Sequence, residues 1–147
     1  MVGLTKSPIL FGLSLLLSGL AAAGCAYKPD LPPTAEVSGT ITFDGQPLPG
    51  AMIQFVPDHQ KGTKGAAGVA ASDPKGQFEL TTAGVKGALV GFHKIAVEAR
   101  KAPKNETDTM PPSLIPARYH NPATSGLSVE VKKGEKNLID LRLKSKP

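Results

Sequence analysis

The stretch VSGTITFDGQPLPGAMIQFV, residues 37–56, decides the fold class. In its first part Val37, Ile41 and Phe43 share one face, and polar residues lie between them. Apolar residues at a period of two are typical of a β-strand with one buried face. Asp44-Gly45 follows as a strong signal of chain reversal, and residues 51–56 alternate again. The sequence therefore predicts two strands joined by a turn.

The second of these strands is apolar on both faces. One face carries Ala51, Ile53 and Phe55, and the other carries Met52, Gln54 and Val56. Such a strand is expected where a sheet is covered on both sides, or where it lies near the N-terminal tether described below.

Five more segments have the composition or alternation of strands: residues 69–73, 77–82, 93–101, 127–131 and 139–143. Residues 73–76, DPKG, suit a type I turn and predict a hairpin between the first two. In the clearest strand, 93–101, His93 shares the inner face with Ile95, Val97 and Ala99. Residues 58–68 are predicted to be a mobile loop, and residues 102–126 a long Pro-rich excursion.

These segments together define the expected fold. The chain has 16 Gly and 14 Pro in 147 residues, and no segment after residue 25 has helical periodicity. The prediction is an all-β fold, a seven-stranded Greek-key β-sandwich over residues 36–147, with a barrel as the alternative.

The N-terminus has the features of an export signal. Lys6 precedes an uncharged, mostly apolar run that ends at Ala22-Ala23-Gly24-Cys25. The run is shorter than the roughly 20 residues of a membrane-spanning helix, so residues 1–24 are predicted to be a cleaved signal peptide. Cys25 is the only cysteine, so no internal disulfide can form.

The end of this run resembles the bacterial lipobox, in which small residues precede a cysteine that is lipidated and becomes the mature N-terminus. The resemblance implies lipidation of Cys25 and anchoring in a membrane. Ala22 stands where the lipobox prefers Leu. Two alternatives remain open: ordinary cleavage after Ala21-Ala22-Ala23, and an uncleaved anchor. Residues 25–35 carry three prolines and are predicted to be an extended tether.

The charge of the predicted mature chain limits the partners only weakly. Because Lys6 is the only charged residue before Cys25, residues 25–147 carry 16 basic and 12 acidic residues. This small excess fits a solvated surface and weakly favours anionic neighbours. We expect the membrane as one partner, an envelope protein or polysaccharide as another, and no nucleic acid.

Two motifs resemble a known family. VSGTITFDGQPLPGAMIQFVP, followed by GVAASDPKGQFELTT, resembles the carboxypeptidase-regulatory-like, or transthyretin-like (prealbumin-type), β-sandwich domain. The resemblance continues at Gly91, His93, Ile95 and Val97, and covers about residues 36–143. Residues 115–131 further resemble small exported proteins of planctomycete-type bacteria, whose own role is uncharacterised. This resemblance implies a β-sandwich, and fold alone does not imply an activity.

Catalytic sets of related folds are not found in the sequence. A related hydroxyisourate hydrolase ends in Tyr-Arg-Gly-Ser, whereas this chain ends in LRLKSKP. Related intradiol dioxygenases hold iron with two Tyr and two His, but Tyr27 of the tether and Tyr119 are the only tyrosines. We therefore expect no enzyme, no catalytic residue, no cofactor and no metal.

The three histidines are the remaining candidates for a site. His93 is predicted to be a partly buried packing residue rather than a ligand. His59, Tyr119 and His120 lie in two loops and form a surface site only if those loops meet. The expected function is that of a non-catalytic interaction or structural domain in the cell envelope, with the outer membrane or cell surface favoured. A carbohydrate-binding module is the alternative, although the chain has no Trp.

Overall fold

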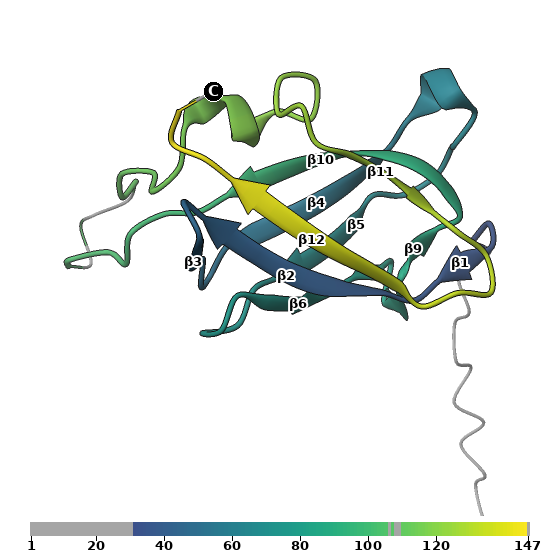
Figure 1. Ribbon diagram of the computed structural model, residues 1–147, viewed down its shortest axis with the longest axis horizontal. Helices are drawn as coiled ribbons and strands as arrows, with labels where there is room; N and C mark the ends of the chain where they lie inside the picture. Colours follow the sequence, from purple (N-terminus) through teal and green to yellow (C-terminus); the bar gives the residue numbers. More distant parts are fainter. Residues whose placement is uncertain (1–30, 106, 108–109, 147) are drawn as a thin grey trace, which may run out of the picture.

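The computed structural model describes residues 31–105, 107 and 110–146. The predicted signal peptide and Cys25 lie outside these described residues. The described chain is built of β-strands and two short 3₁₀ helices, η1 (His59–Lys61) and η2 (Ala117–His120), so the all-β class is confirmed. Figure 1 shows the strands crossing the molecule in two layers.

The larger sheet has six strands in the order β11-β10-β4-β5-β7-β8. Its neighbouring strands are antiparallel. The bounds are β4 (Met52–Pro57), β5 (Gly68–Ala71), β7 (Thr81–Thr82), β8 (Val85–Lys86), β10 (Gly91–Glu98) and β11 (Ser128–Val131).

The second sheet has four strands. It contains β2 (Val37–Phe43), β3 (Gln46–Pro47), β6 (Gln77–Glu79) and β12 (Asn137–Leu143). Strands β3 and β6 share one edge of β2, and β12 pairs with the other edge. The β12–β2 pair is parallel, with Asn137 opposite Val37 and Leu143 opposite Phe43. A separate pair joins β1 (Thr34–Ala35) to β9 (Ala88–Leu89), so the last residues of the predicted tether belong to the fold.

Buried side chains from both sheets form one core. Fully buried members include Ile53, Phe55 and Val97 of the larger sheet, and Ile41 of the smaller one. The rings of Phe55 and Phe78 approach to 6.5 Å between centroids at an angle of 58°, a tilted geometry that aromatic pairs favour. The alternation predicted at 37–43 and 93–101 thus fills the space between the sheets.

Seven of the twelve described strands have three residues or more, and each overlaps one predicted segment. The hairpin predicted at residues 69–82 is only partly correct. The turn forms, because Gly76 donates to Asp73 O at 2.9 Å. However, β6 then pairs with β2 of the other sheet, and only Thr81 returns to pair with Val69 of β5. Phe78 explains the change: it is buried opposite Gly39, in a place where a side chain on Gly39 would meet its ring.

Residues 58–63 of the predicted mobile loop include η1 and are bonded to β10, and residue 68 already belongs to β5. Asp58 caps η1 by accepting from the Gln60 amide at 3.1 Å. The buried hydroxyl of Thr63 accepts from the Phe92 amide at 2.8 Å, and the Asp58 amide donates to Phe92 O. The side chains of Asp58 and Thr63 thus form hydrogen bonds with backbone groups that would bond to water in an open loop.

Candidate functional site

The predicted lipidation residue, Cys25, is outside the described residues, as is the signal segment 1–24. Neither 3₁₀ helix of the described chain has the length and hydrophobicity needed to cross a membrane.

His59 lies on η1, beside the beginning of β10. Its side chain is exposed. The neighbouring Lys61 places its Nζ atom 4.4 Å from the centre of the Phe92 ring, a distance at which cation–π attraction acts. The polar groups of η1 therefore serve to attach this turn to β10.

Tyr119 lies on η2 and is buried. Its hydroxyl oxygen accepts from the Lys144 amide at 2.9 Å and lies 3.2 Å from Lys144 O, to which it donates. The Arg118 guanidinium lies over the ring at 4.6 Å and also donates to the phenol oxygen. These contacts attach η2 to the end of β12, so Tyr119 has a structural task that occupies its hydroxyl.

His120 is half-buried, and its Nε2 atom lies 3.0 Å from Ser113 Oγ. The shortest contact of this hydroxyl is with Ile115 O, at 2.8 Å. With the hydroxyl proton on that carbonyl, His120 Nε2–H donates to Ser113, and Nδ1 is left as an acceptor. A serine held in this way orders the loop. It lacks the free hydroxyl proton that a base-activated nucleophile gives to its histidine.

The structure does not bring all three candidate residues together. Figure 1 shows η1 and η2 at opposite ends of β10. The neighbours of His59 in sequence, Asp58 and Lys61, contact Phe92 at the start of this strand, and His120 lies by Glu98 at its end. Tyr119 and His120 are neighbours, but only His120 faces a hollow in the surface.

That hollow lies on the outer face of the larger sheet, with η2 at its border. It has a volume of about 270 Å³, and its lining residues come from β4, β5, β10 and η2: Met52, Ile53, Gln54, Val69, Ala96, Glu98 and His120. Because alternate residues of a strand face opposite sides, Met52 and Gln54 line it from β4 while Ile53 and Phe55 fill the core. We call this the outer-face hollow.

The outer-face hollow is apolar at its walls and polar at its rim. Met52 is 55% exposed and Val69 is 40% exposed, while Ala96 forms a buried floor. Glu98 is exposed and lies opposite Met52 in the β10–β4 pair. Within the described part of the chain, no cation and no hydrogen-bond donor pairs with the Glu98 carboxylate. The hollow therefore offers one free negative charge beside apolar surface.

The exposure of Met52 corrects the prediction made for strand 51–56 and identifies a binding surface that the prediction did not include. Strand 51–56 was expected to be covered on both sides or to lie near the tether. Its inner face is buried, but Met52 and Gln54 of its outer face are exposed. The apolar residues on the second face were the signal of this site, since Met52 lies together with Val69 and Ala96 on one solvated sheet face, and a contiguous apolar patch is a feature of a binding surface.

Two other hollows are less suited to one ligand. One, of about 240 Å³, lies near the start of β2 and carries Glu36, Glu79, Lys86 and Lys136 on its lining, so its charges balance. The other is wider and lies on the outer face of the second sheet, along β2 and β6.

His93 is wholly buried, rather than partly buried as predicted. It is 1% exposed and its ring lies 6.0 Å from that of Phe55. Nδ1 lies 3.1 Å from Gly91 O, to which it donates, and Nε2 has no hydrogen-bond partner. Burial lowers the pKa of His93 below its usual value of 6.5, against a smaller opposing effect of the Gly91 carbonyl. This residue belongs to the core, where burial favours the neutral form of its imidazole.

Among the described residues, no three His, Cys, Asp or Glu side chains gather as a metal site would require. Comparison of the chain with protein-family models, with curated proteins and with solved structures gives no match.

Proposed function

We propose that the protein is an exported lipoprotein, anchored in a membrane through Cys25, whose β-domain of residues 36–147 binds a protein partner in the cell envelope without catalysis. The anchor is supported by the small residues before the lone cysteine. Two acyl chains or more, at about 0.8 kcal/mol per buried CH₂, give stable attachment where one is marginal.

The domain fits a Greek-key β-sandwich of the transthyretin-like, carboxypeptidase-regulatory-like type. This finer description is part of the proposal. Its support is a core shared by two sheets, together with seven longer strands that match the segments of the resemblance. The parallel pairing of β12 with β2 is the feature that a simple series of hairpins would not give.

The outer-face hollow is the observation that carries the binding function. Met52 and Val69 expose apolar surface there, and Glu98 adds a carboxylate without a counter-charge. An alkyl chain that ends in a cation matches both features, since its methylene groups cover apolar atoms while its charge remains at the rim. We therefore assign the hollow to a Lys or Arg side chain on an extended segment of the partner.

The carbohydrate-binding alternative has less support. Sugar sites use exposed aromatic rings as platforms, and the described rings are engaged elsewhere. Phe55, Phe78 and Tyr119 are buried, Phe43 packs on the core, and Lys61 lies over Phe92.

The anchor is tested with the full chain expressed in a bacterial host and labelled with a radioactive fatty acid. Cys25→Ala is expected to remove the label and release the protein from the membrane fraction. Tyr27→Phe, two residues further on, is the matched control and should keep both. Equal labelling and membrane retention of Cys25→Ala would exclude lipidation at this residue.

The binding site is tested by a photo-crosslinking amino acid at position 52 of the full chain in its native cell. We expect an adduct with one protein through a basic residue, weakened by Glu98→Gln and abolished by Glu98→Lys. The same cross-linker at position 75, in the exposed turn between β5 and β6, is the control. An adduct with a polysaccharide, or one that is insensitive to the charge at position 98, would overturn the assignment.

A further inference from the structure

Strand β12 forms an outer edge of its sheet, and one side of its backbone is unpaired. In a parallel pair, alternate residues direct both their N–H and their C=O groups to the same neighbour. Asn137 donates to Glu36 O and Leu143 accepts from the Asp44 amide, so the odd-numbered residues face β2. The backbone groups of Leu138, Asp140 and Arg142 therefore point to the free edge.

This edge lacks two of the usual protections against pairing, which are short length and interruption of the strand. Edge strands are commonly short, or interrupted by Pro or a bulge. The edge strands β3 and β8 of the described chain have two residues each, whereas β12 has seven and contains no Pro. On its outer face Leu138 is 79% exposed. A long, regular and partly apolar edge is suited to accept another strand.

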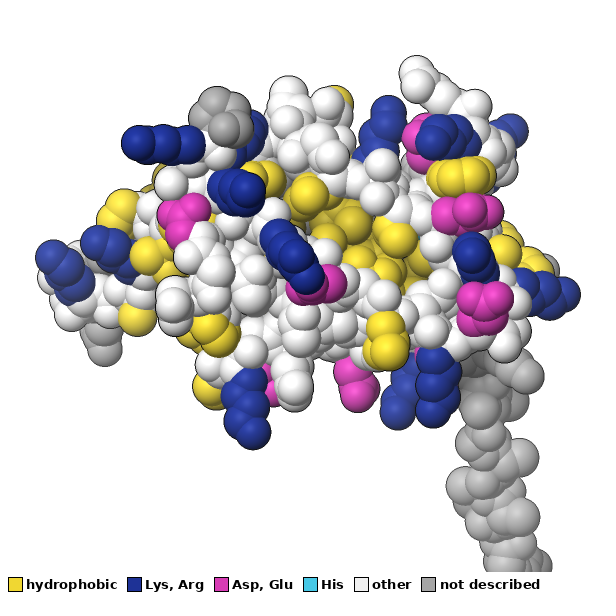
Figure 2. All heavy atoms as spheres, viewed as in Figure 1, with side chains coloured by type: hydrophobic (Ala, Val, Ile, Leu, Met, Phe, Trp, Pro, Cys, Tyr) yellow, Lys and Arg dark blue, Asp and Glu magenta, His cyan; other side chains and the backbone are white. Residues whose placement is uncertain are grey.

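Apolar side chains of the core are also open to solvent beside this edge. Figure 2 shows a hollow with hydrophobic side chains at its base, in the part of the view where Figure 1 draws β11 and β12. Val129 of β11 and Ile139 of β12 pack on the core but are only partly buried. A strand added to the free edge of β12 would lie across this opening.

Two charged residues decide which strand fits. Asp140 and Arg142 lie on the outer face of β12, and their side chains form an ion pair with Nη2 2.7 Å from Oδ2. Both are well exposed, at 46% for Asp140 and 78% for Arg142. When two identical strands pair antiparallel, an acidic residue and a basic residue two positions apart can each lie opposite the other in the second strand. Both cross-strand pairs then join opposite charges.

We propose that the protein forms a dimer in which β12 pairs antiparallel with β12 of a second copy, centred on Leu141. Asp140 then lies opposite Arg142 of the second copy, and Arg142 opposite its Asp140. Because these residues all direct their backbone groups to the free edge, each opposed pair exchanges both N–H···O bonds. On the inner face Ile139 meets Leu143 of the second copy and extends the core.

The neighbouring registers are less favourable. A pair centred on Asp140 would place the two Asp140 carboxylates directly opposite each other, and like charges in this position destabilise a sheet. A pair centred on Ile139 would place Leu138 opposite Asp140 and leave Arg142 without a partner in the ladder. On the C-terminal side the ladder ends at Lys144, whose amide already donates to Tyr119.

The test uses two charge variants of the full chain, purified in detergent with different affinity tags. Asp140→Arg makes both positions basic, and Arg142→Asp makes both acidic. Each variant alone places like charges opposite each other, so we expect dimerisation at least about tenfold weaker by light scattering, since two cross-strand pairs change from attraction to repulsion.

Mixing the two variants is the decisive step. Every opposed pair is then again acid against base, so the mixed dimer should form and the two tags should co-purify. The double variant, with both substitutions in one chain, should dimerise like the original. Glu130→Arg, on β11 of the other sheet, is the matched control and should leave the dimer intact. The circular dichroism spectrum of each variant shows whether it is folded.

Three results would overturn the proposal: an original chain that is monomeric at all concentrations, single variants that dimerise normally, or folded variants that fail to associate when mixed. None of these results bears on Cys25 or on the outer-face hollow, so this proposal and the proposed function fail separately.

Discussion

The phenol oxygen of Tyr119 lies 2.9 Å from the amide nitrogen of Lys144, and this contact joins η2 to the residue that follows β12. The neighbouring Arg118 also donates to Lys144 O and Lys146 O, so two side chains of η2 hold the loop that borders the outer-face hollow to the end of the second sheet. Tyr119 thus supports the site although it does not line it.

Tyr119→Phe should reduce the free energy of unfolding by about 1–2 kcal/mol, because the Lys144 amide and carbonyl lose a partner while the ring still fills its place. Urea denaturation measures this change. Tyr119→Leu, which also removes ring packing, should lose more. Equal stability of Tyr119→Phe and the original chain would show that water replaces the hydroxyl.

Ser72→Ala should destabilise the domain by about 1–3 kcal/mol. The buried Ser72 hydroxyl donates to Leu48 O at 2.6 Å and accepts from the Ala51 amide at 2.8 Å. Both backbone groups would remain buried without a partner. The control Ser128→Ala, at an exposed position of β11, should change stability by less than about 0.5 kcal/mol. Thermal or urea unfolding compares the two, and similar values for both would contradict this account.

Gly39→Ala should destabilise the domain far more than the addition of one methyl group usually does. A Cβ atom at this position would overlap the carbonyl of Ile139, so β2 and β12 would have to separate. We expect a loss of about 3 kcal/mol or more, with much of the protein unfolded or insoluble. Gly45→Ala is the control: its φ is +81° but a Cβ meets nothing within 4 Å, so only about 1–2 kcal/mol should be lost. Urea denaturation of both variants distinguishes these effects.

Stability should fall in mild acid because of His93. Burial lowers its folded-state pKa below 6.5, so the unfolded chain binds the proton more readily. The contribution of neutral His93 is therefore complete above pH 6.5 and is lost as the pH falls below it. Unfolding measured between pH 7.5 and pH 5 should show this slope, and His93→Phe should reduce it. An unchanged slope in His93→Phe would assign the effect to other groups.

The carboxyl groups of Asp44 and Asp140 affect stability at lower pH, so they do not contribute to the slope measured between pH 7.5 and pH 5. Hydrogen bonds from Ser145 lower the pKa of Asp44, and those from Arg142 and Thr40 lower the pKa of Asp140, both below 3.8. Stabilisation by a carboxylate with a lowered pKa is present above the unfolded-state value and is lost only below it.

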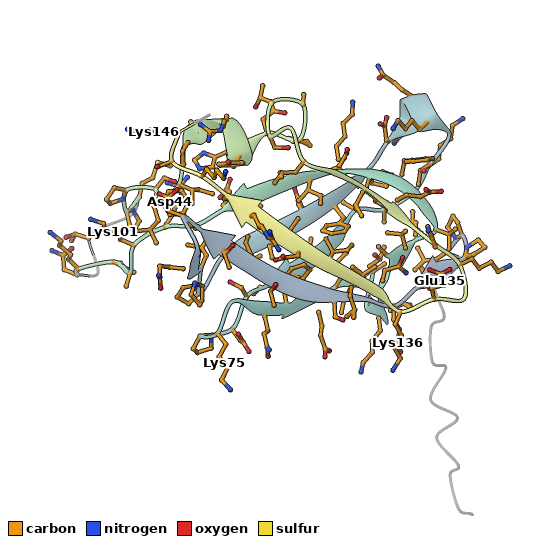
Figure 3. The ribbon with its side chains drawn as sticks, viewed as in Figure 1. Asp44, Lys75, Lys101, Glu135, Lys136 and Lys146 are labelled. Carbon is orange, nitrogen blue, oxygen red and sulfur yellow. The ribbon has the colours of Figure 1, made fainter. Side chains whose placement is uncertain are left out.

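The strands could be predicted from the sequence because each has its own period of two. Val37, Ile41 and Val97 are buried where alternation places them. Which strands pair with each other was harder to predict, because alternation shows which face of a strand is buried and not which strand is its neighbour. Residues 127–131 and 139–143 look like two arms of one hairpin, yet β11 joins β10 and β12 joins β2. Glu135 and Lys136 lie in the turn that carries the chain between the two sheets (Figure 3).

The site was only partly predictable for a similar reason. His120 was named from its polarity, but His59 and Tyr119 do not share its hollow. Met52 and Glu98 come together because they are opposite in the β10–β4 pair, a relationship between residues far apart in the sequence.

The parallel ladder between β2 and β12 also affects how the chain is made. Val37 is paired with Asn137, so one edge of β2 can be paired only by a strand that lies 100 residues further along the chain. During synthesis from the N-terminus, one side of β2 stays unpaired until the last strand has left the ribosome. The two edges of β2 are therefore paired at different times, and a chain truncated before residue 137 would leave one of them open.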